Sequence, residues 1–167
     1  MLLGLPGAGK STVGPLVAAR LGWRFVDLDD VISAEAGFRI TEIFAREGEP
    51  GFRAREARAT GAIAAEALVL APGGGWIEDP SNMRALGVGT LSVYLRVSVM
   101  VALSRMGESA GTRPLIAGAR SADQLRELLR RREALYLQAN HTVNVDSMTP
   151  VAVGDSIVAL ASHRSAD

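Results

Sequence analysis

The spacing of apolar residues changes repeatedly along the chain, and this alternation predicts strands that are each followed by helices. Short, mostly apolar runs that are typical of buried strands cover residues 1–5, 24–28, 68–70 and 91–97, and residues 141–146 are predicted to form a last strand. Between these runs, apolar residues recur every three or four positions, as in helices with one buried face. We predict longer helices over 11–21, 30–36, 40–47, 51–67 and 121–140, with shorter helices after 80 and 98 and a last helix from 150.

Strands that alternate with helices predict a parallel sheet with helices on both faces. The expected fold class is therefore α/β, a three-layer α/β/α domain around a five-stranded parallel sheet. Very few residues precede Gly4, so the first strand is expected to be short for the centre of a sheet. Residues 107–120 contain three glycines, show no clear period, and are expected to form a lid.

The composition is that of one globular domain over residues 1–167, with 48% hydrophobic residues and a formal net charge of +0. A neutral chain lacks the basic field that non-specific binding to nucleic acid or to a membrane surface requires. The absence of cysteine excludes disulfides and thiolate metal sites. No stretch is long enough to span a membrane, and no signal peptide is recognised at the start, so we expect a cytoplasmic protein. We also expect a monomer.

The segment from Gly4 to Ser11 matches the phosphate-binding pattern G-x-x-x-x-G-K-[ST] at every fixed position, between a predicted strand and a predicted helix. In such a loop, backbone amides and the helix N-terminus surround phosphate oxygens. Lys10 is the only lysine of the chain and is expected to face solvent and to reach the terminal phosphates of ATP. The predicted ATP-binding residues are Gly7, Ala8, Gly9, Lys10, Ser11 and Thr12, and the Ser11 hydroxyl is a predicted ligand of Mg²⁺.

Five further features occur in order along the chain, some at the ends of predicted strands and others on predicted helices. They are the pair Asp27 and Asp29, Arg53 in the segment Phe52–Glu56, the triple glycine 73–75, Arg113 in the segment 112–115, and Arg132 shortly before Tyr136. Each alone has an ordinary explanation: solvated residues after a strand, a surface pair of Arg53 with Glu56, a tight turn, or a charged helix face. Ligands in such sheets bind beyond the carboxyl ends of the strands. Most of these features fall there, so we interpret them jointly as parts of one site.

The order and spacing of these motifs resemble the shikimate kinase family, and the resemblance runs from Gly4 to about Asp146. It implies a P-loop kinase that uses ATP and Mg²⁺ to phosphorylate the 3-hydroxyl of shikimate. By this resemblance Asp29 is the candidate base, Asp27 lies beside the metal, and Arg113 belongs to the lid that closes over the phosphates. The catalytic residues it implies are Lys10, Asp29 and Arg113.

The same resemblance implies that Arg53 and Arg132 hold the acceptor's carboxylate, which suits the planar fork of a guanidinium. It places a backbone amide of Gly74 and the side chain of Asp29 against the acceptor, and Arg105 beside the adenine. The family often carries an arginine in the loop after the last strand, whereas residues 147–150 of this chain hold no basic residue. This difference concerns how adenine is held.

Two other functions compete with this interpretation. A gluconate kinase has a similar architecture, but the paired aspartates, the triple glycine and the segment from Arg132 to Tyr136 favour shikimate. A kinase-like domain kept as a ligand sensor would have no need of Lys10, Asp29 and Arg113. Of the two tryptophans, Trp23 is expected in the core, and Trp76 either packs in the core or forms a wall of the acceptor pocket.

Overall fold

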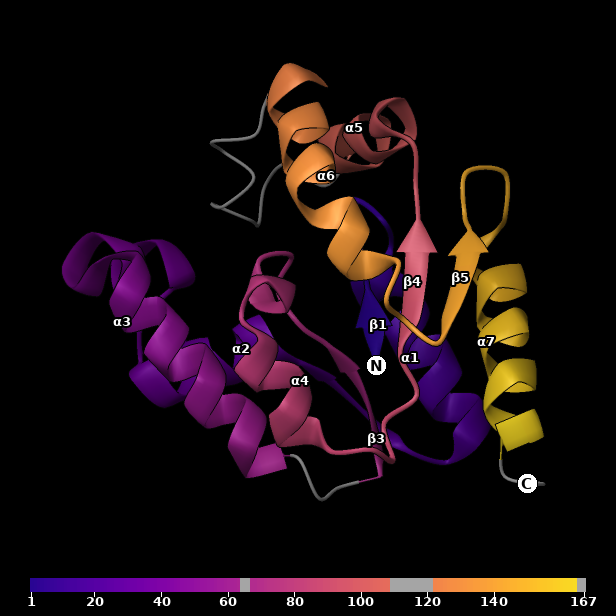
Figure 1. Ribbon diagram of the computed structural model, residues 1–167, viewed down its shortest axis with the longest axis horizontal. Helices are drawn as coiled ribbons and strands as arrows, with labels where there is room; N and C mark the ends of the chain where they lie inside the picture. Colours follow the sequence, from indigo (N-terminus) through magenta and orange to yellow (C-terminus); the bar gives the residue numbers. More distant parts are fainter. Residues whose placement is uncertain (64–66, 109–121, 165–167) are drawn as a thin grey trace.

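The computed structural model describes residues 1–63, 67–108 and 122–164, in which parallel strands alternate with helices (Figure 1). The strands are β1 (Leu2–Leu3), β2 (Arg24–Asp27), β3 (Leu68–Ala71), β4 (Val93–Arg96) and β5 (His141–Asn144). The helices are α1 (Lys10–Leu21), α2 (Leu28–Ala36), α3 (Ile40–Ile63), the 3-10 helix η1 (Trp76–Glu78), α4 (Pro80–Leu86), α5 (Val99–Glu108), α6 (Ala122–Tyr136) and α7 (Pro150–Arg164).

All the strand pairs in the described residues are parallel, as the alternation of strands and helices predicts. Hydrogen bonds join them as two sheets, one with the order β1-β4-β5 and one of β2 and β3. The single five-stranded sheet is not confirmed, because no hydrogen-bonded ladder joins β1 to β3 among the described residues. The two sheets nevertheless lie side by side, with β1 against β3. The short length of β1 leaves little backbone to pair on both sides.

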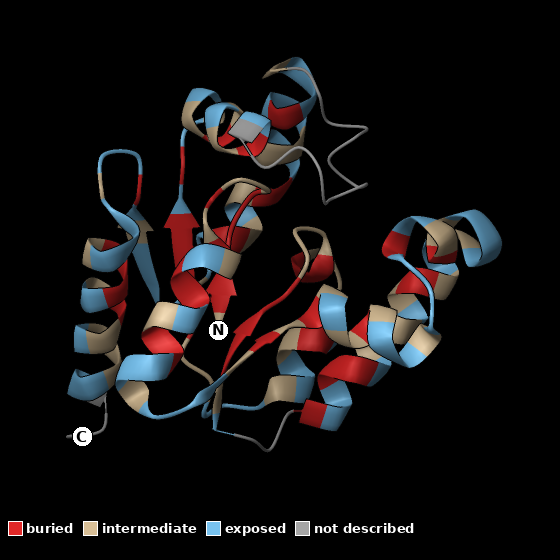
Figure 2. Ribbon diagram, turned by 180° about the vertical axis from the view of Figure 1, so that it is seen from behind, coloured by how far each residue is buried: buried red, intermediate tan, exposed pale blue. Residues whose placement is uncertain are grey.

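Helices pack against the strands and against one another to enclose the core. α1 packs on α7, α2 on α3, and α5 on α6. The buried faces of α1 and α7 include Val13, Val17 and Val153, and these meet the apolar side chains of the strands. In Figure 2 the buried residues lie mainly on β1, β3 and β4 and on the inward faces of the helices, whereas β5 is largely exposed. No helix within the described ranges combines the length and apolar character needed to cross a bilayer.

The carboxyl ends of the strands meet at one edge of the molecule. In Figure 1 the arrows of β4 and β5 point toward the end where α5 and α6 lie. The ring of Tyr136 on α6 stacks on that of Tyr94 in β4, with centroids 5.1 Å apart. Both tyrosines are buried, so α6 is anchored over the sheet edge where ligands are expected.

Several boundaries differ from the sequence prediction. The two helices expected at 40–47 and 51–67 are both present within α3, where they meet at a kink at Gly48 (φ 68°), but α3 ends at Ile63. α6 ends at Tyr136 instead of continuing to residue 140. Gly107 and Glu108 are helical and close α5, so they are not part of an irregular lid. The rest of the expected lid, residues 109–120, lies outside the described residues.

Candidate active site

The phosphate loop connects β1 to α1 and owes its path to glycine. Gly4, Gly7 and Gly9 have positive φ values of 146°, 80° and 97°, which side chains other than hydrogen rarely permit. A methyl group built on Gly7 would lie 2.5 Å from the carbonyl oxygen of Ala102 in α5. The loop therefore packs against α5, which follows β4, and its backbone amides lie near the N-terminus of α1, as anion binding requires.

Lys10 is the first residue of α1 and is buried, with 7% of its surface exposed. Its Nζ donates hydrogen bonds to the carbonyl oxygens of Gly4, at 2.8 Å, and of Leu5, at 3.1 Å. The expectation that Lys10 faces solvent is therefore wrong. The loop folds back over its own lysine, and these carbonyl contacts hold the ammonium group beside the start of α1.

Oxygen ligands for a divalent cation meet between α1 and β2. The Ser11 hydroxyl donates to Oδ2 of Asp27 at 2.8 Å. The other oxygen of Asp27, Oδ1, accepts from the amide of Asp29 at 3.2 Å and so caps α2. A hydroxyl and a carboxylate at this spacing fit Mg²⁺, which prefers hard oxygen ligands and keeps several waters. Ser11 and Asp27 are thus brought together as the sequence predicted.

The triple glycine after β3 forms a turn that charged side chains approach closely. A methyl group built on Gly73 would lie 3.1 Å from Oδ1 of Asp29 and 3.2 Å from Oε1 of Glu56. One built on Gly74 would lie 3.4 Å from Nη1 of Arg132. The hydroxyl of Tyr136 donates to the Gly74 carbonyl at 2.7 Å and ties the turn to α6.

The guanidinium of Arg53 also lies against this turn, where a methyl group on Gly75 would contact it. Asp29 from α2, Arg53 from α3 and Arg132 from α6 therefore surround three consecutive glycines. These residues are far apart in sequence, and the structure brings them together as the sequence predicted. The arrangement places two guanidinium groups and the carboxyl groups of Asp29 and Glu56 around a short, partly exposed stretch of backbone, and the two cations suit an acidic ligand.

Arg53 is held by glutamates on its own helix. Its Nη1 donates to Oε2 of Glu56 at 2.6 Å, and its Nη2 donates to Oε1 of Glu49 at 3.0 Å. Glu56 is 0% exposed, so the pair of Arg53 with Glu56 is not an ordinary surface pair, because one partner is fully buried. Burial, helped by the negative charge of Asp29, raises the pKa of Glu56 to about 7 despite the opposing charge and hydrogen bond of Arg53.

Arg132 is 8% exposed, although it lies in a run of three arginines that a sequence would place on a solvated face. Its Nη2 donates to Oε2 of Glu78 in η1 at 3.0 Å. Its Nε is buried and has no hydrogen-bond partner in the structure. A buried donor without an acceptor costs about 1–3 kcal/mol, so this N–H fits a site that an anionic ligand completes.

Three other residues were singled out in the sequence, namely Arg105, Arg113 and Trp76. The Arg105 side chain reaches from α5 to the carbonyl oxygen of Val145 just after β5, at 2.7 Å from Nη2. Its contact with adenine stays a prediction. Arg113 lies outside the described residues. Trp76 is fully buried, with its Nε1 donating to the Thr60 hydroxyl at 2.8 Å, so packing explains it and a pocket wall does not.

Two glutamates beside this site, Glu56 and Glu78, were not predicted from the sequence as site residues. Glu56 carried only the i, i+3 spacing of an ordinary helix pair with Arg53. Glu78 carried no signal at all, since it stands just before the Asp79-Pro80 start of α4 and pairs with a helix 54 residues away.

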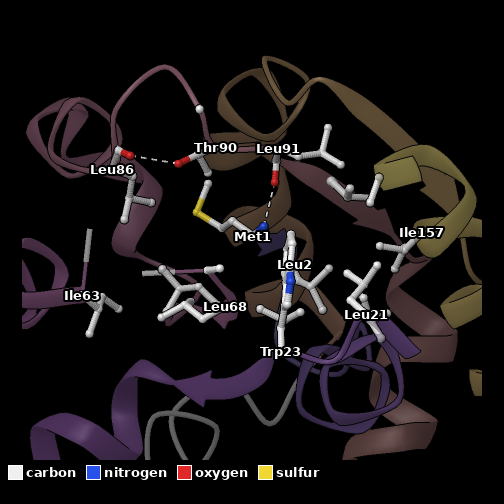
Figure 3. Close-up of a pocket in the computed structure, with 17 residues that line it drawn as sticks. Met1, Leu2, Leu21, Trp23, Ile63, Leu68, Leu86, Thr90, Leu91 and Ile157 are labelled. Carbon is white, nitrogen blue, oxygen red and sulfur yellow. Dashed lines mark hydrogen bonds between the residues drawn. The ribbon is translucent and has the colours of Figure 1, made fainter. Parts of the chain in front are cut away.

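A cavity of about 530 Å³ lies at the opposite ends of the strands and holds none of these residues (Figure 3). Apolar side chains line most of it, and the Met1 ammonium group donates to the Leu91 carbonyl beside it at 2.7 Å. Trp23 borders the cavity and is 44% exposed, so its expected place in the core is wrong. No charged side chain is found among the described residues that line the cavity, and none of them belongs to the candidate active site.

Comparisons with known proteins show which family the chain resembles. The family model for shikimate kinase matches residues 6–161. A shikimate kinase of Gloeobacter violaceus is 40% identical over 167 residues, which cover 99% of this chain and 94% of that protein. One of Synechococcus sp. (strain RCC307) is 44% identical over 144 residues, which cover 86% of this chain and 73% of that protein.

Solved structures point the same way. Shikimate kinase from Acinetobacter baumannii in complex with shikimate has a TM-score of 0.89 and 36% identity, covering 98% of this chain and 92% of that chain. A gluconokinase from Sinorhizobium meliloti 1021 has a TM-score of 0.58 at 17% identity, a likeness of fold alone. The fold is therefore the α/β fold of P-loop kinases, and the chain belongs to the shikimate kinase family.

Proposed function

We propose that this chain transfers the γ-phosphoryl group of ATP to the 3-hydroxyl of shikimate, giving 3-phosphoshikimate and ADP. The observation that carries the proposal is the meeting of Asp29, Arg53 and Arg132 around the glycine turn 73–75. Family membership and a related structure with bound shikimate support the same acceptor. We further propose that the chain acts as a cytoplasmic monomer.

The acceptor side of the reaction rests on three side chains. Arg53 and Arg132 bind the carboxylate of shikimate, each through hydrogen bonds from a positively charged guanidinium. Gly74 leaves room for the acceptor beside Arg132 and presents its backbone amide. Asp29 orients the 3-hydroxyl and accepts its proton as the new O–P bond forms. The electron pair of the broken bond stays on the β-phosphate oxygen of ADP.

The donor side rests on the phosphate loop. The amides from Gly7 to Thr12 at the start of α1 surround the phosphates, and Lys10 neutralises charge on the terminal ones. Mg²⁺, held by Ser11 and through water by Asp27, would neutralise further charge on the phosphates. Arg105 stays the proposed neighbour of adenine, and Arg113 a proposed contact of the transferring phosphoryl group. Catalysis then depends mainly on position and on cations, as expected for phosphoryl transfer.

A substrate panel with product identification tests the proposal. The chain is incubated with ATP and Mg²⁺ together with shikimate, quinate or gluconate, and phosphorus NMR identifies the phosphate ester formed. We expect a single ester on the 3-hydroxyl of shikimate and little product from gluconate. An ester formed from gluconate alone would assign the chain to the competing kinase activity.

A further inference from the structure

Glu78 connects η1 to two neighbouring arginines of α6. Its Oε2 accepts from Nη2 of Arg132 at 3.0 Å, and its Oε1 accepts from Nη2 of Arg131 at 2.8 Å. Glu78 follows the glycine turn 73–75 by three residues, so one carboxylate couples the end of this turn to the helix that carries Arg132. Burial alone would raise the pKa of Glu78, but hydrogen bonds from the two arginines outweigh it and keep the pKa below its ordinary value.

The two arginines differ in how they depend on Glu78. The Arg131 side chain is 53% exposed and can be solvated by water, whereas that of Arg132 is only 10% exposed. An exposed ion pair contributes little, while a largely buried guanidinium needs an acceptor inside the protein to fix its orientation. The contact with Glu78 therefore matters mainly for Arg132.

The hydrogen bond to Glu78 leaves N–H donors of the Arg132 guanidinium available for a ligand. A guanidinium has five N–H donors, and the hydrogen bond to Glu78 uses one of them. Nε is buried and has no hydrogen-bond partner. The plane of the guanidinium is thus anchored on one side while donors remain for a second carboxylate. Planar, two-bond recognition of a carboxylate loses strength quickly when the guanidinium rotates.

We propose that Glu78 is a positioning residue for the acceptor site, which holds Arg132 in the orientation that receives the acceptor's carboxylate. The inference rests on the proposed function, because it concerns the affinity for the same acid. It assigns to Glu78 an effect on acceptor binding and none on the nucleotide or on the chemical step, since its contacts run to α6 and not to the phosphate loop.

The alternative is that Glu78 competes with the acceptor for Arg132. The charges argue against it, because one carboxylate is shared by two arginines and the group keeps a net charge of +1. An incoming carboxylate still meets a cation. Removal of Glu78 raises this charge to +2, but the added charge is that of exposed Arg131 and is screened by water.

Four variants distinguish these roles: Glu78→Ala, Glu78→Gln, Arg131→Ala and the control Glu127→Ala. Glu127 pairs with Arg130 on the exposed face of the same helix, so its removal breaks an equivalent ion pair outside the site. Glutamine keeps one acceptor oxygen, and the amide turns that oxygen to buried Arg132 because Arg131 can be solvated. For each variant, calorimetry measures shikimate affinity without ATP, and steady-state assays measure kcat and both KM values.

We expect Glu78→Ala to weaken shikimate binding by about tenfold, the loss of one charge-assisted hydrogen bond, with kcat and the KM for ATP within about twofold of the parent. Glu78→Gln should recover most of the affinity, and Arg131→Ala and Glu127→Ala should resemble the parent. Tighter shikimate binding in Glu78→Ala would overturn the proposal in favour of competition. An equal loss in both Glu78 variants, or a parallel loss of kcat and of ATP affinity, would also overturn it. A parent chain that binds shikimate but does not phosphorylate it would refute the proposed function and leave the binding comparison intact.

Discussion

Replacement of Lys10 by methionine separates the role of this residue in the reaction from its role in the fold. Methionine keeps an unbranched side chain of similar length and removes the charge. In the structure Lys10 donates to the carbonyl oxygens of Gly4 and Leu5 and is almost fully buried. A loss of activity could therefore arise from a damaged phosphate loop, and stability has to be measured beside turnover.

The opposing terms for stability are of similar size. Two hydrogen bonds from a charged donor contribute about 3–6 kcal/mol together. Burial of the ammonium group costs several kcal/mol, and a cation at the N-terminus of a helix costs about 0.3–1 kcal/mol more. We therefore expect Lys10→Met to change the free energy of unfolding by no more than about 1 kcal/mol. In the reaction, no opposing term offsets the loss of the positive charge of Lys10 beside the phosphates of ATP. Turnover should therefore fall at least about a thousandfold, or about 4 kcal/mol.

Urea denaturation and ADP release measure the two effects, with Arg20→Met as a control. Arg20 is a partly exposed residue of the same helix, paired with Asp155 on α7. The control should keep its turnover. A Lys10→Met protein that turns over normally would refute the assignment of the phosphate loop. A loss of stability above about 3 kcal/mol would show that Lys10 is held for the fold and that the balance above is wrong.

Three other changes test the acceptor side. Arg132→Lys keeps the charge but loses paired hydrogen bonding, so calorimetry should find shikimate binding weaker by about 1.5–3 kcal/mol with unchanged ATP binding. Gly74→Ala places a methyl group 3.4 Å from Nη1 of Arg132, which is an ordinary contact. The free energy of unfolding, measured by urea denaturation, should therefore change by less than about 1 kcal/mol, while the KM for shikimate rises. Glu56→Gln tests the raised pKa of about 7: the folded parent binds a proton that the unfolded chain releases, so its stability relative to the variant should fall from pH 5 to pH 8 by up to about 3 kcal/mol. A stability difference that is independent of pH would refute that raised pKa.

Local patterns predicted the parts of the site that depend on neighbouring residues. The phosphate loop is a contiguous segment whose glycines, lysine and serine have fixed roles, so its place between β1 and α1 follows from sequence alone. The approach of Asp29 to residues 73–75 followed from the rule that strand ends meet at one edge of a parallel sheet. The place of Arg53 and Arg132, which lie on helices α3 and α6, was implied by the resemblance to the shikimate kinase family.

Contacts between distant segments could not be predicted in the same way. Glu78 and Arg132 are 54 residues apart, and no periodicity connects a 3-10 turn to the face of a later helix. The complete burial of Glu56 depends on how α3 lies against the glycine turn, which the i, i+3 spacing does not report. The burial of Lys10 was not predicted because the sequence pattern describes contacts to phosphate and does not report that carbonyl oxygens of the loop itself accept from the ammonium group.

The most direct test of the central claim is ADP release by the parent chain from ATP and Mg²⁺, measured with and without shikimate. A phosphate loop and an acceptor pocket that form one site predict slow release without shikimate and a large, saturable increase when it is added. A rate of release that shikimate does not change would contradict the assignment of Asp29, Arg53 and Arg132 to this acceptor.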